Sequence, residues 1–564
     1  MYLFDIFRSF LPMRNPIGFG ASDFIIFTIA ALMALLLVAW AWLKPWIKQI
    51  AERTWFCIAL LFALPILLRL TLLAHCPVPG GTGADDFSYL LLGDTLRHLR
   101  LANPPHPLHQ FFEQVFVLQQ PTYSSIYPLG QGIALAFGRI ALESFWAGVL
   151  LSTGVFCALC YWMLRAWVPP VWSLAGGVLA VLQFGVLNPW VNSYWGGAVS
   201  ASAGCLVFGS LPRLRRSPRA CYGVLLGIGV VLQIITRPFE SLFLTAAAVA
   251  FLLFAFRRHL LTAAKPLSIT LAVASAGILL TALQNKAVTR SWTTMPYVLS
   301  RYQYGVPATF TFEPNAVPHA PLTPEQELDY RAQAAIHGPE TDSLRSYLSR
   351  LAYRFRYVRF FLLPPLYLAI VACFLNPRRA NCAWAVATIG LFALGTNVYP
   401  YFFPHYLAAV SCLFLLLTVQ GLANLRMLIS KQILLLCSLS FLFWFGVYLS
   451  GNPKVLPAAE YQSWNYINIG DPQDRIAIRE KLAREPGQQL VFVRYSPAHR
   501  FQEWVHNAAE IDSAQTVWAN DLGSENNLLL QYFPHRKAWL LEPDLRPPAL
   551  NPYETGSGAF LRVH

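Results

Sequence analysis

The sequence predicts a polytopic α-helical membrane protein that carries a small soluble α/β domain at its C-terminal end. Of 564 residues, 56% are hydrophobic and only 12% are charged, and the mean hydropathy is +0.45. A soluble domain usually carries about 25% charged residues. In addition, apolar runs long enough to cross a bilayer recur along most of the chain, and the pattern changes near its end. Such a chain needs lipid as part of its solvent.

Twelve apolar runs are candidate membrane spans, because a spanning helix needs about 20 mostly apolar residues. Several are short, so we expect about eleven to thirteen spans. The membrane domain is therefore predicted over residues 1–450, with large loops at 76–144 and 286–357. The candidate spans are residues 22–43, 55–74, 147–166, 172–188, 197–211, 221–236, 240–256, 267–285, 359–375, 382–398, 404–423 and 431–449.

The distribution of basic residues predicts the orientation of these spans. Short loops rich in Lys and Arg stay in the cytoplasm, and in the twelve-span arrangement the basic loops all fall on one side. The two large loops and the C-terminal tail then lie on the opposite, outer side. The net charge of +14 comes from the membrane part, which indicates lipid headgroups as partners and not nucleic acid. The basic loops contain Lys44, Lys48, Arg53, Arg213, Arg215, Arg216, Arg219, Arg257, Arg258, Lys265, Arg378 and Arg379.

A soluble α/β domain is predicted over residues 451–564. Three short apolar runs read as buried strands, and two stretches between or before them read as helices. The order resembles βαβ winding, but the segment contains no Gly-rich phosphate loop, so a nucleotide-binding role has little support. The strands are expected at Leu490–Val493, Thr516–Ala519 and Ala538–Leu541, and the helices at Arg475–Arg484 and Asn526–Phe533.

An acidic pair, Asp85 and Asp86, opens the first large loop directly after the second span. A carboxylate held at the edge of a low-dielectric region can accept a proton from an acceptor hydroxyl or orient it for attack. Acidic residues also suit a helix N-terminus, so helix capping is the alternative interpretation. Both interpretations follow from spacing alone.

This pair, followed by Phe87 and Tyr89 after an early span, resembles the signature of the C superfamily of glycosyltransferases (GT-C). The superfamily includes protein mannosyltransferases and aminoarabinose transferases, which use polyprenyl-phosphate sugars. The resemblance implies a GT-C-like helix bundle in which Asp85 is catalytic and Asp86 is its neighbour. Many members have Glu at the second position, so the division of labour between the two carboxylates stays open. Further stretches resemble a poorly characterised group of bacterial membrane proteins near this superfamily, as in Gln119–Tyr123, Tyr127–Gly132, Arg494–Pro497 and Trp539–Pro543.

Basic and aromatic residues at helix ends are candidates for binding an anionic lipid substrate. Arg is suited to phosphate contacts, so Arg237, Arg301 and His405 are predicted to hold the lipid phosphate. Arg237 and Glu240 alternatively pair with each other, and His405 is alternatively an interfacial residue bonded to the backbone. A sugar or acceptor is expected to contact aromatic and amide side chains, with membrane anchoring as the alternative for the turn 192–195. These candidates are Tyr89, Tyr123, Tyr127, Gln131, Asn192, Tyr194, Trp195, Tyr304 and Tyr406.

The sequence shows no clear metal-binding motif. His98, His106 and His109 share the first loop with the acidic pair, but intervening prolines interrupt regular ligand spacing. We therefore expect no cofactor, although a divalent ion at the acidic pair stays open. Between residues 345 and 356, apolar residues at helical spacing predict an amphipathic interfacial helix.

These observations predict a multi-pass enzyme of the bacterial inner (plasma) membrane with a periplasmic active face. It would move a sugar from a polyprenyl-phosphate donor to a glycan, lipid or protein acceptor. The first alternative is a transporter or flippase, which the scarcity of ionisable residues within the spans disfavours. The second is a noncatalytic envelope assembly protein that keeps the same fold.

Overall fold

The computed structural model describes residues 16–36, 44–81, 83–257, 260–338, 341–375, 380–451, 474–497, 499 and 502–554. The predicted loop residues Arg258, Arg378 and Arg379, residues 37–43 of the first span, and most of the expected start of the C-terminal domain lie outside these ranges.

The chain divides into two compact units. The helical unit comprises Met1–Val78, Ala141–Thr281 and Asp342–Ile469. The loop unit comprises Pro79–Ile140, Ala282–Thr341 and Gly470–His564. The loop unit thus combines parts of both large predicted loops with the C-terminal segment. A separate domain over 451–564 stays a prediction.

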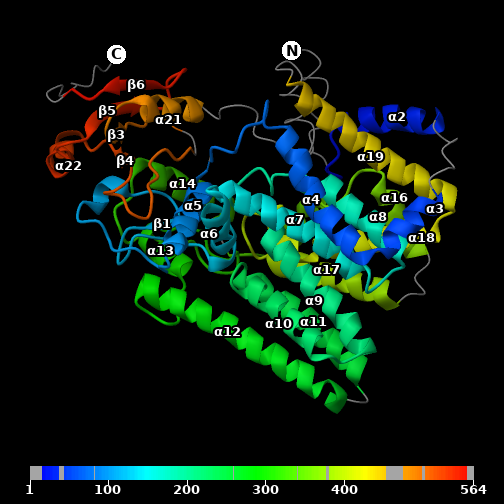
Figure 1. Ribbon diagram of the computed structural model, residues 1–564. Helices are drawn as coiled ribbons and strands as arrows, with labels where there is room; N and C mark the ends of the chain where they lie inside the picture. The colour runs from blue at the N-terminus through cyan, green and yellow to red at the C-terminus, as the bar shows by residue number, and fades with distance from the viewer. Residues whose placement is uncertain are drawn as a thin grey trace. The chain divides into compact units, whose positions relative to one another are not determined.

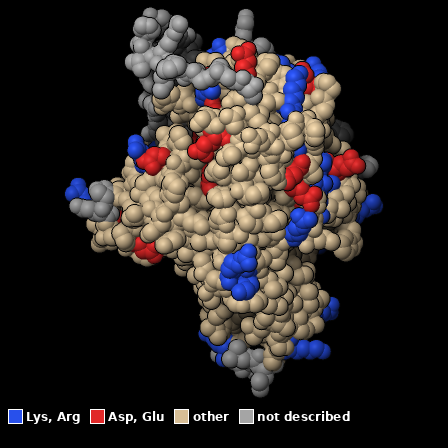
Figure 2. Space-filling model, turned by 90° about the vertical axis from the view of Figure 1, so that its left-hand side faces the viewer, with Lys and Arg blue, Asp and Glu red and all other residues tan. Residues whose placement is uncertain are grey.

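Each of the twelve predicted spans contains a helix, as expected for a polytopic helical protein (Figure 1). Among the described residues, five helices and the segment Pro404–Asn424 are long and apolar enough to cross a membrane; the five helices are α4, α7, α11, α12 and α19. Large uncharged areas cover the face seen in Figure 2, as a lipid-exposed protein requires. The helices are α2 (Ala21–Leu36), α4 (Thr54–Thr71), α7 (Phe145–Leu164), α8 (Pro170–Ala180), α9 (Ala198–Arg216), α10 (Ala220–Ile234), α11 (Pro238–Phe256), α12 (Ala264–Thr289), α16 (Leu366–Leu375), α17 (Ala380–Thr396), α18 (Ser411–Asn424) and α19 (Met427–Ser450).

Small residues allow the helices of the helical unit to approach closely. Helix α9 is rich in Ala, Ser and Gly, and most of its residues are buried. A Cβ added at Gly204 would collide with the carbonyl oxygen of Ala409, and one at Gly421 would collide with that of Ala369. Without water between helices to drive association, close packing of this kind holds membrane helices together.

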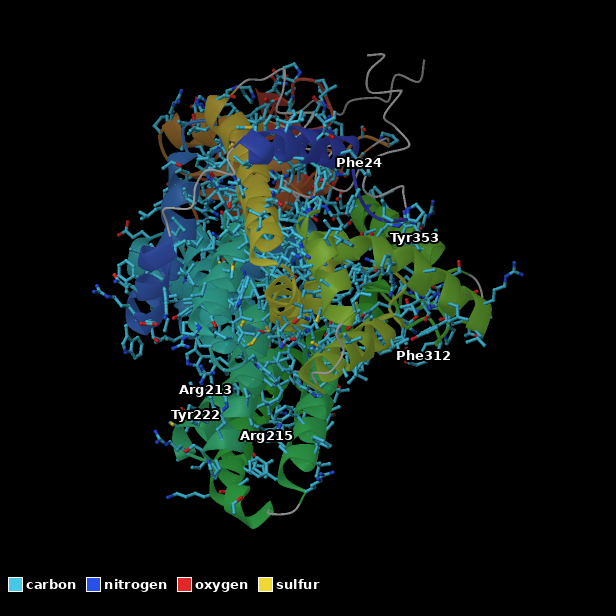
Figure 3. All side chains as sticks on the ribbon, turned by 90° about the vertical axis from the view of Figure 1, so that its right-hand side faces the viewer. Phe24, Arg213, Arg215, Tyr222, Phe312 and Tyr353 are labelled. Atoms are coloured by element: carbon cyan, nitrogen blue, oxygen red, sulfur yellow. The ribbon has the colours of Figure 1, made fainter. Side chains whose placement is uncertain are left out.

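The basic end of α9 binds backbone carbonyl groups of α7 and of the turn that directly follows α7. Arg213 stacks 4.0 Å from the Trp162 ring centroid and donates to the Trp162 carbonyl oxygen over 2.7 Å. Arg216 donates to the Ala166 carbonyl oxygen over 2.8 Å. Figure 3 labels Arg213 and Arg215 at this end of α9 and Tyr222 in the following helix α10. These cations therefore also satisfy carbonyl groups that a helix end leaves without partners.

The loop unit contains more helix than the sequence predicted. Its helices are α5 (Ala84–Arg97), most of α6 (Leu129–Leu142), α13 (Pro296–Tyr304), α14 (Pro324–His337), α21 (Arg475–Arg484) and α22 (Asn526–Tyr532). The amphipathic helix expected over 345–356 is present as α15 (Leu344–Arg354) in the helical unit, and its Leu344 and Leu348 side chains are exposed.

A four-stranded sheet has the order β4-β3-β5-β6. It comprises β3 (Gln489–Val493), β4 (Thr516–Asn520), β5 (Lys537–Glu542) and β6 (Ala549–Pro552). The three predicted strands are present and pair in parallel, whereas the antiparallel edge strand β6 was not predicted.

Both faces of this sheet are buried, which explains why its strands read as continuous apolar runs. Leu490 and Phe492 of β3 point into a core that also contains Leu91, Phe111 and Phe112 of the first loop. The alternate residues of β3 point into a second core around Trp504 and Trp539. The C-terminal sheet therefore completes its core with residues from the first loop.

Candidate active site

The acidic pair lies in the first turn of α5. Gly83 is the N-cap of this helix, and Ala84 separates it from Asp85. The backbone N–H of Asp86 donates to the Gly83 carbonyl oxygen over 3.1 Å. Their negative charges suit the positive end of the helix. Neither aspartate, however, occupies the N-cap position that the capping interpretation would assign to it.

Asp85 is instead bonded to a tyrosine from another part of the loop unit. The Tyr127 hydroxyl donates a hydrogen bond to Asp85 Oδ1. The ring of Tyr127 stacks on Tyr89, with centroids 4.2 Å apart and an interplanar angle of 9°. The Tyr127 carbonyl oxygen accepts from Gln284 Nε2 over 2.8 Å. The fold thus brings together Asp85, Tyr89 and Tyr127, all three of which the sequence singled out.

Two arginines that the sequence analysis did not single out lie beside the acidic pair. Arg475 of α21 is 1% exposed and lies between the rings of Phe87 and Trp504, at 4.7 and 4.3 Å from their centroids. Arg479, one turn later, donates to the Gly80 carbonyl oxygen over 3.2 Å. Burial and the neighbouring Arg479 lower the pKa of Arg475 to about 9, while charges that include Asp86 act in the opposite direction.

Next to Arg475, the buried Glu503 lies in a network of neutral donors. Its Oε1 accepts from the Tyr495 hydroxyl over 3.1 Å and its Oε2 from the Val115 N–H over 3.3 Å. Burial and the charge of Glu325 raise the pKa of Glu503 to about 8. We therefore expect Glu503 to be protonated at neutral pH.

Glu503→Gln is expected to make the protein less sensitive to alkaline pH. Because the pKa of Glu503 is raised from 4.5 to about 8 in the folded state, the fold loses stability as pH rises through this window. Glutamine is neutral throughout and has the same shape. The melting temperature of the variant should exceed that of the wild type by roughly 2–5 °C at pH 8.5 and match it near pH 5. An equal decline with pH in both proteins would contradict this assignment.

In the helical unit, five other predicted residues lie together. The ring of His405 lies 5.0 Å from Trp195 and 4.8 Å from Tyr406, measured between centroids. The Arg237 guanidinium lies 5.2 Å from the Tyr406 ring centroid. Glu240, in the first turn of α11, is 1% exposed, and its Oε1 has no hydrogen-bond partner among the described residues. This group is a cation–aromatic cluster at the ends of helices.

Asn192 has structural partners in the same unit. Its Oδ1 accepts from Arg69 Nε over 2.7 Å, and its Nδ2 donates to two backbone carbonyls. Arg69 itself is fully buried and also donates to the carbonyl oxygens of Cys76 and Pro77. Asn192 therefore fixes the chain at the end of α4, and Arg69 is a buried cation that the sequence analysis missed.

The other predicted residues are engaged within their own surroundings. Arg301 donates to the carbonyl oxygens of Pro307 and Ala308 over 3.1 and 3.2 Å. The Tyr123 hydroxyl donates to the Asn507 carbonyl oxygen over 3.1 Å, and its ring belongs to the sheet core. Three further candidates, Gln131, Tyr194 and Tyr304, are likewise buried.

Within the described part of the chain, no group of three or more His, Cys, Asp or Glu side chains is arranged to hold a metal ion. Two histidines of the first loop lie instead beside single carboxylates. His106 Nε2 lies 3.1 Å from Asp512 Oδ1, and His109 Nδ1 lies 3.6 Å from Glu113 Oε1. Metal independence stays a prediction.

No family model and no curated protein matches the chain. Among solved structures, it is similar to ArnT from Cupriavidus metallidurans in the apo state, with 12% identity and a TM-score of 0.49, over 86% of this chain and 92% of that one. ArnT bound to undecaprenyl phosphate gives 11% identity and a TM-score of 0.45, over 78% and 82% of the two chains.

The archaeal oligosaccharyltransferase AglB from Archaeoglobus fulgidus, in complex with an inhibitory peptide and a dolichol-phosphate, gives 11% identity and a TM-score of 0.37, over 89% of this chain and 70% of that one. At these identities and TM-scores, the likeness assigns no role to any residue of this chain.

Proposed function

We propose that this chain is a membrane glycosyltransferase that moves a sugar from a polyprenyl-phosphate donor to an acceptor, with Asp85 as the base or orienting carboxylate. The observation that most supports it is the bond from Tyr127 to Asp85, at the first turn of α5. A carboxylate that only interacted with the positive end of the helix dipole would not require a hydrogen bond from a tyrosine in a distant segment. The bond fixes the direction of the carboxylate, as a reaction in one geometry requires.

In the proposed reaction, the acceptor hydroxyl attacks the anomeric carbon of the sugar as the bond to the lipid phosphate breaks. The hydroxyl proton passes to Asp85, and the lipid phosphate leaves as an anion. Such a leaving group is stabilised by cations and hydrogen-bond donors. Arg237, Arg301 and His405 remain the predicted phosphate contacts, and Tyr127, Gln131 and Trp195 the predicted contacts of the sugar or acceptor.

The proposal places the protein in the bacterial inner membrane, with the loop unit on the periplasmic side. Its partners would be the polyprenyl-phosphate sugar, membrane lipid and a glycan, lipid or protein acceptor, and not nucleic acid. The buried ionisable residues Arg69 and Glu240 lie in the last turn of α4 and the first turn of α11. A transport pathway usually places such residues near the middle of the bilayer, so these positions favour an enzyme.

The full chain, purified and reconstituted in vesicles, tests this proposal. The probe is undecaprenyl phosphate linked to a labelled hexose or aminosugar, supplied with an extract of envelope lipids and glycans as acceptors. We expect release of free undecaprenyl phosphate and covalent transfer of the label. Movement of intact donor across the bilayer would instead favour a transporter, and neither event with any donor would favour a noncatalytic protein.

A further inference from the structure

The C-terminal segment, from residue 474 onward, holds the backbone on both sides of the acidic pair. Before the pair, Arg479 Nη1 of α21 donates to the Gly80 carbonyl oxygen over 3.2 Å. After the pair, the Phe87 ring stacks on the ring of His506, with centroids 4.1 Å apart and an interplanar angle of 25°. The acidic pair therefore lies between two points at which the same segment fixes the chain.

The backbone before α5 packs directly on the Phe87 ring. Gly81 has a φ of +73°, and a Cβ added there would lie 3.0 Å from the Phe87 ring and 3.6 Å from Asp86 Cβ. Glycine is the residue that adopts this backbone conformation without strain, and its missing side chain leaves room for the ring. A displacement of the Phe87 ring would therefore also displace the start of α5, where the acidic pair lies.

His506 is held in one orientation as a neutral ring. Its Nδ1 lies 2.8 Å from the Trp504 carbonyl oxygen, which only accepts, so Nδ1 carries the proton. Its Nε2 lies 2.6 Å from Nη2 of Arg479, which only donates, so Nε2 is the acceptor. The ring also stacks on Trp518 of β4, with centroids 5.5 Å apart and an interplanar angle of 19°. His506 thus connects Phe87 to both α21 and the sheet.

Arg475 adds a cation to the contacts of Phe87. Its guanidinium lies 4.7 Å from the Phe87 ring centroid and 4.3 Å from that of Trp504. Its Nη2 donates to the Glu503 carbonyl oxygen over 2.6 Å, whereas its Nε and Nη1 have no hydrogen-bond partner among the described residues. The two aromatic faces therefore supply much of what stabilises this buried charge. Phe87 thus contacts a guanidinium and an imidazole of the C-terminal segment, and an apolar core would need neither.

We propose that the C-terminal segment positions the acidic pair for sugar transfer, with Phe87 and His506 as the positioning residues. This inference rests on the proposed function. The hydrogen bond from Tyr127 fixes the direction of the Asp85 carboxylate, whereas the stack of Phe87 on His506 fixes the backbone from which that carboxylate extends. A misplacement of about 1 Å can cost roughly 10²-fold in rate. Loss of the stack should therefore lower kcat and leave the donor Kd unchanged.

The test is a double-mutant cycle between Phe87→Leu and His506→Ala in the full chain, reconstituted in vesicles with undecaprenyl-phosphate hexose as the donor. Each single variant removes the stack and should lower kcat roughly 10- to 100-fold. The donor Kd should stay within about twofold of the wild-type value, because the lost interaction does not contact the donor. The double variant should be no slower than the slower single variant, since the stack is lost only once. Additive losses in kcat would overturn the inference.

A conservative variant and a matched control show whether the ring itself matters. His506→Phe keeps a flat ring against Phe87 and should recover kcat to within about threefold of wild type, because aromatic rings stack on one another without the imidazole nitrogens. His535→Ala is the control, since His535 is an exposed histidine of the same segment, and its kcat should equal that of the wild type. An equal loss of kcat in His506→Phe and His506→Ala would contradict a positioning role of the stack.

Hydrogen exchange separates this result from a failure of the proposed function, because it needs no turnover. In His506→Ala, the backbone amides of residues 86–92 should exchange roughly tenfold faster than in the wild type and in His535→Ala, while those of β5 stay unchanged. Faster exchange throughout the loop unit would mean a general structural role and would overturn the inference. Local loosening in a chain that transfers no sugar would support the contact and exclude the transferase. Undiminished transfer by His506→Ala would do the reverse.

Discussion

Asp85→Asn is expected to lower sugar transfer about 10²- to 10⁴-fold without weakening donor binding. Positioned general bases contribute on this scale. Asparagine has the same shape, and its Oδ1 still accepts from the Tyr127 hydroxyl that holds Asp85. What the variant loses is the basicity and the negative charge, and neither is needed to recognise an anionic donor. The measurement is kcat and donor Kd in the vesicle assay.

Three variants calibrate this result. Tyr127→Phe removes one hydrogen bond and should cost roughly tenfold in kcat. The kcat of Asp86→Asn, compared with that of Asp85→Asn, shows how much each of the two carboxylates contributes to transfer. Glu480→Gln replaces a carboxylate that is 60% exposed in the same unit and should be neutral. If the transfer rate of Asp85→Asn were within about threefold of the wild-type rate, Asp85 would not be catalytic. Its charge would then only stabilise the start of the helix.

Arg69→Met is expected to destabilise the helical unit by about 3–5 kcal/mol. The Arg69 side chain is fully buried, and its three donors satisfy Asn192 Oδ1 and the carbonyl oxygens of Cys76 and Pro77. Methionine fills similar space but leaves two buried acceptors and one half-buried acceptor without this donor. The melting temperature in detergent should fall by roughly 6–15 °C.

Arg215→Met is the matched control, since Arg215 is an exposed arginine at the end of α9 in the same unit. Its melting temperature should remain within about 1 °C of wild type. Arg69→Lys should fall between the two, because an ammonium group does not reproduce the fork of a guanidinium. A melting temperature of Arg69→Met equal to that of the control would mean that these bonds contribute nothing net.

The helices were predictable because each depends mainly on its own run of apolar residues. All twelve candidate spans contain a helix, and the parallel strands of the C-terminal segment are also where the sequence placed them. Helix α14 escaped prediction because it buries Glu325 and Gln333, so its face carries no apolar stripe. Strand β6 is a short edge strand whose residues Asn551 and Pro552 are exposed.

The candidate site was predictable only in part. The acidic pair and Tyr89 lie on one helix, and a local motif is enough to single them out. The partner residues come from segments far apart in the chain, such as Arg475 beside Phe87 and Glu503 beside Val115. No spacing rule connects residues almost four hundred positions apart.

The sequence alone determined which segments need lipid around them and where carboxylates stand at a helix start, because hydropathy and charge act on each segment separately. The tertiary structure alone decided which side chains share a low-dielectric environment. It placed Tyr127 on Asp85 and enclosed Arg475 between two rings. Protonation depends on all neighbours at once, so it follows from the fold and not from the order of residues.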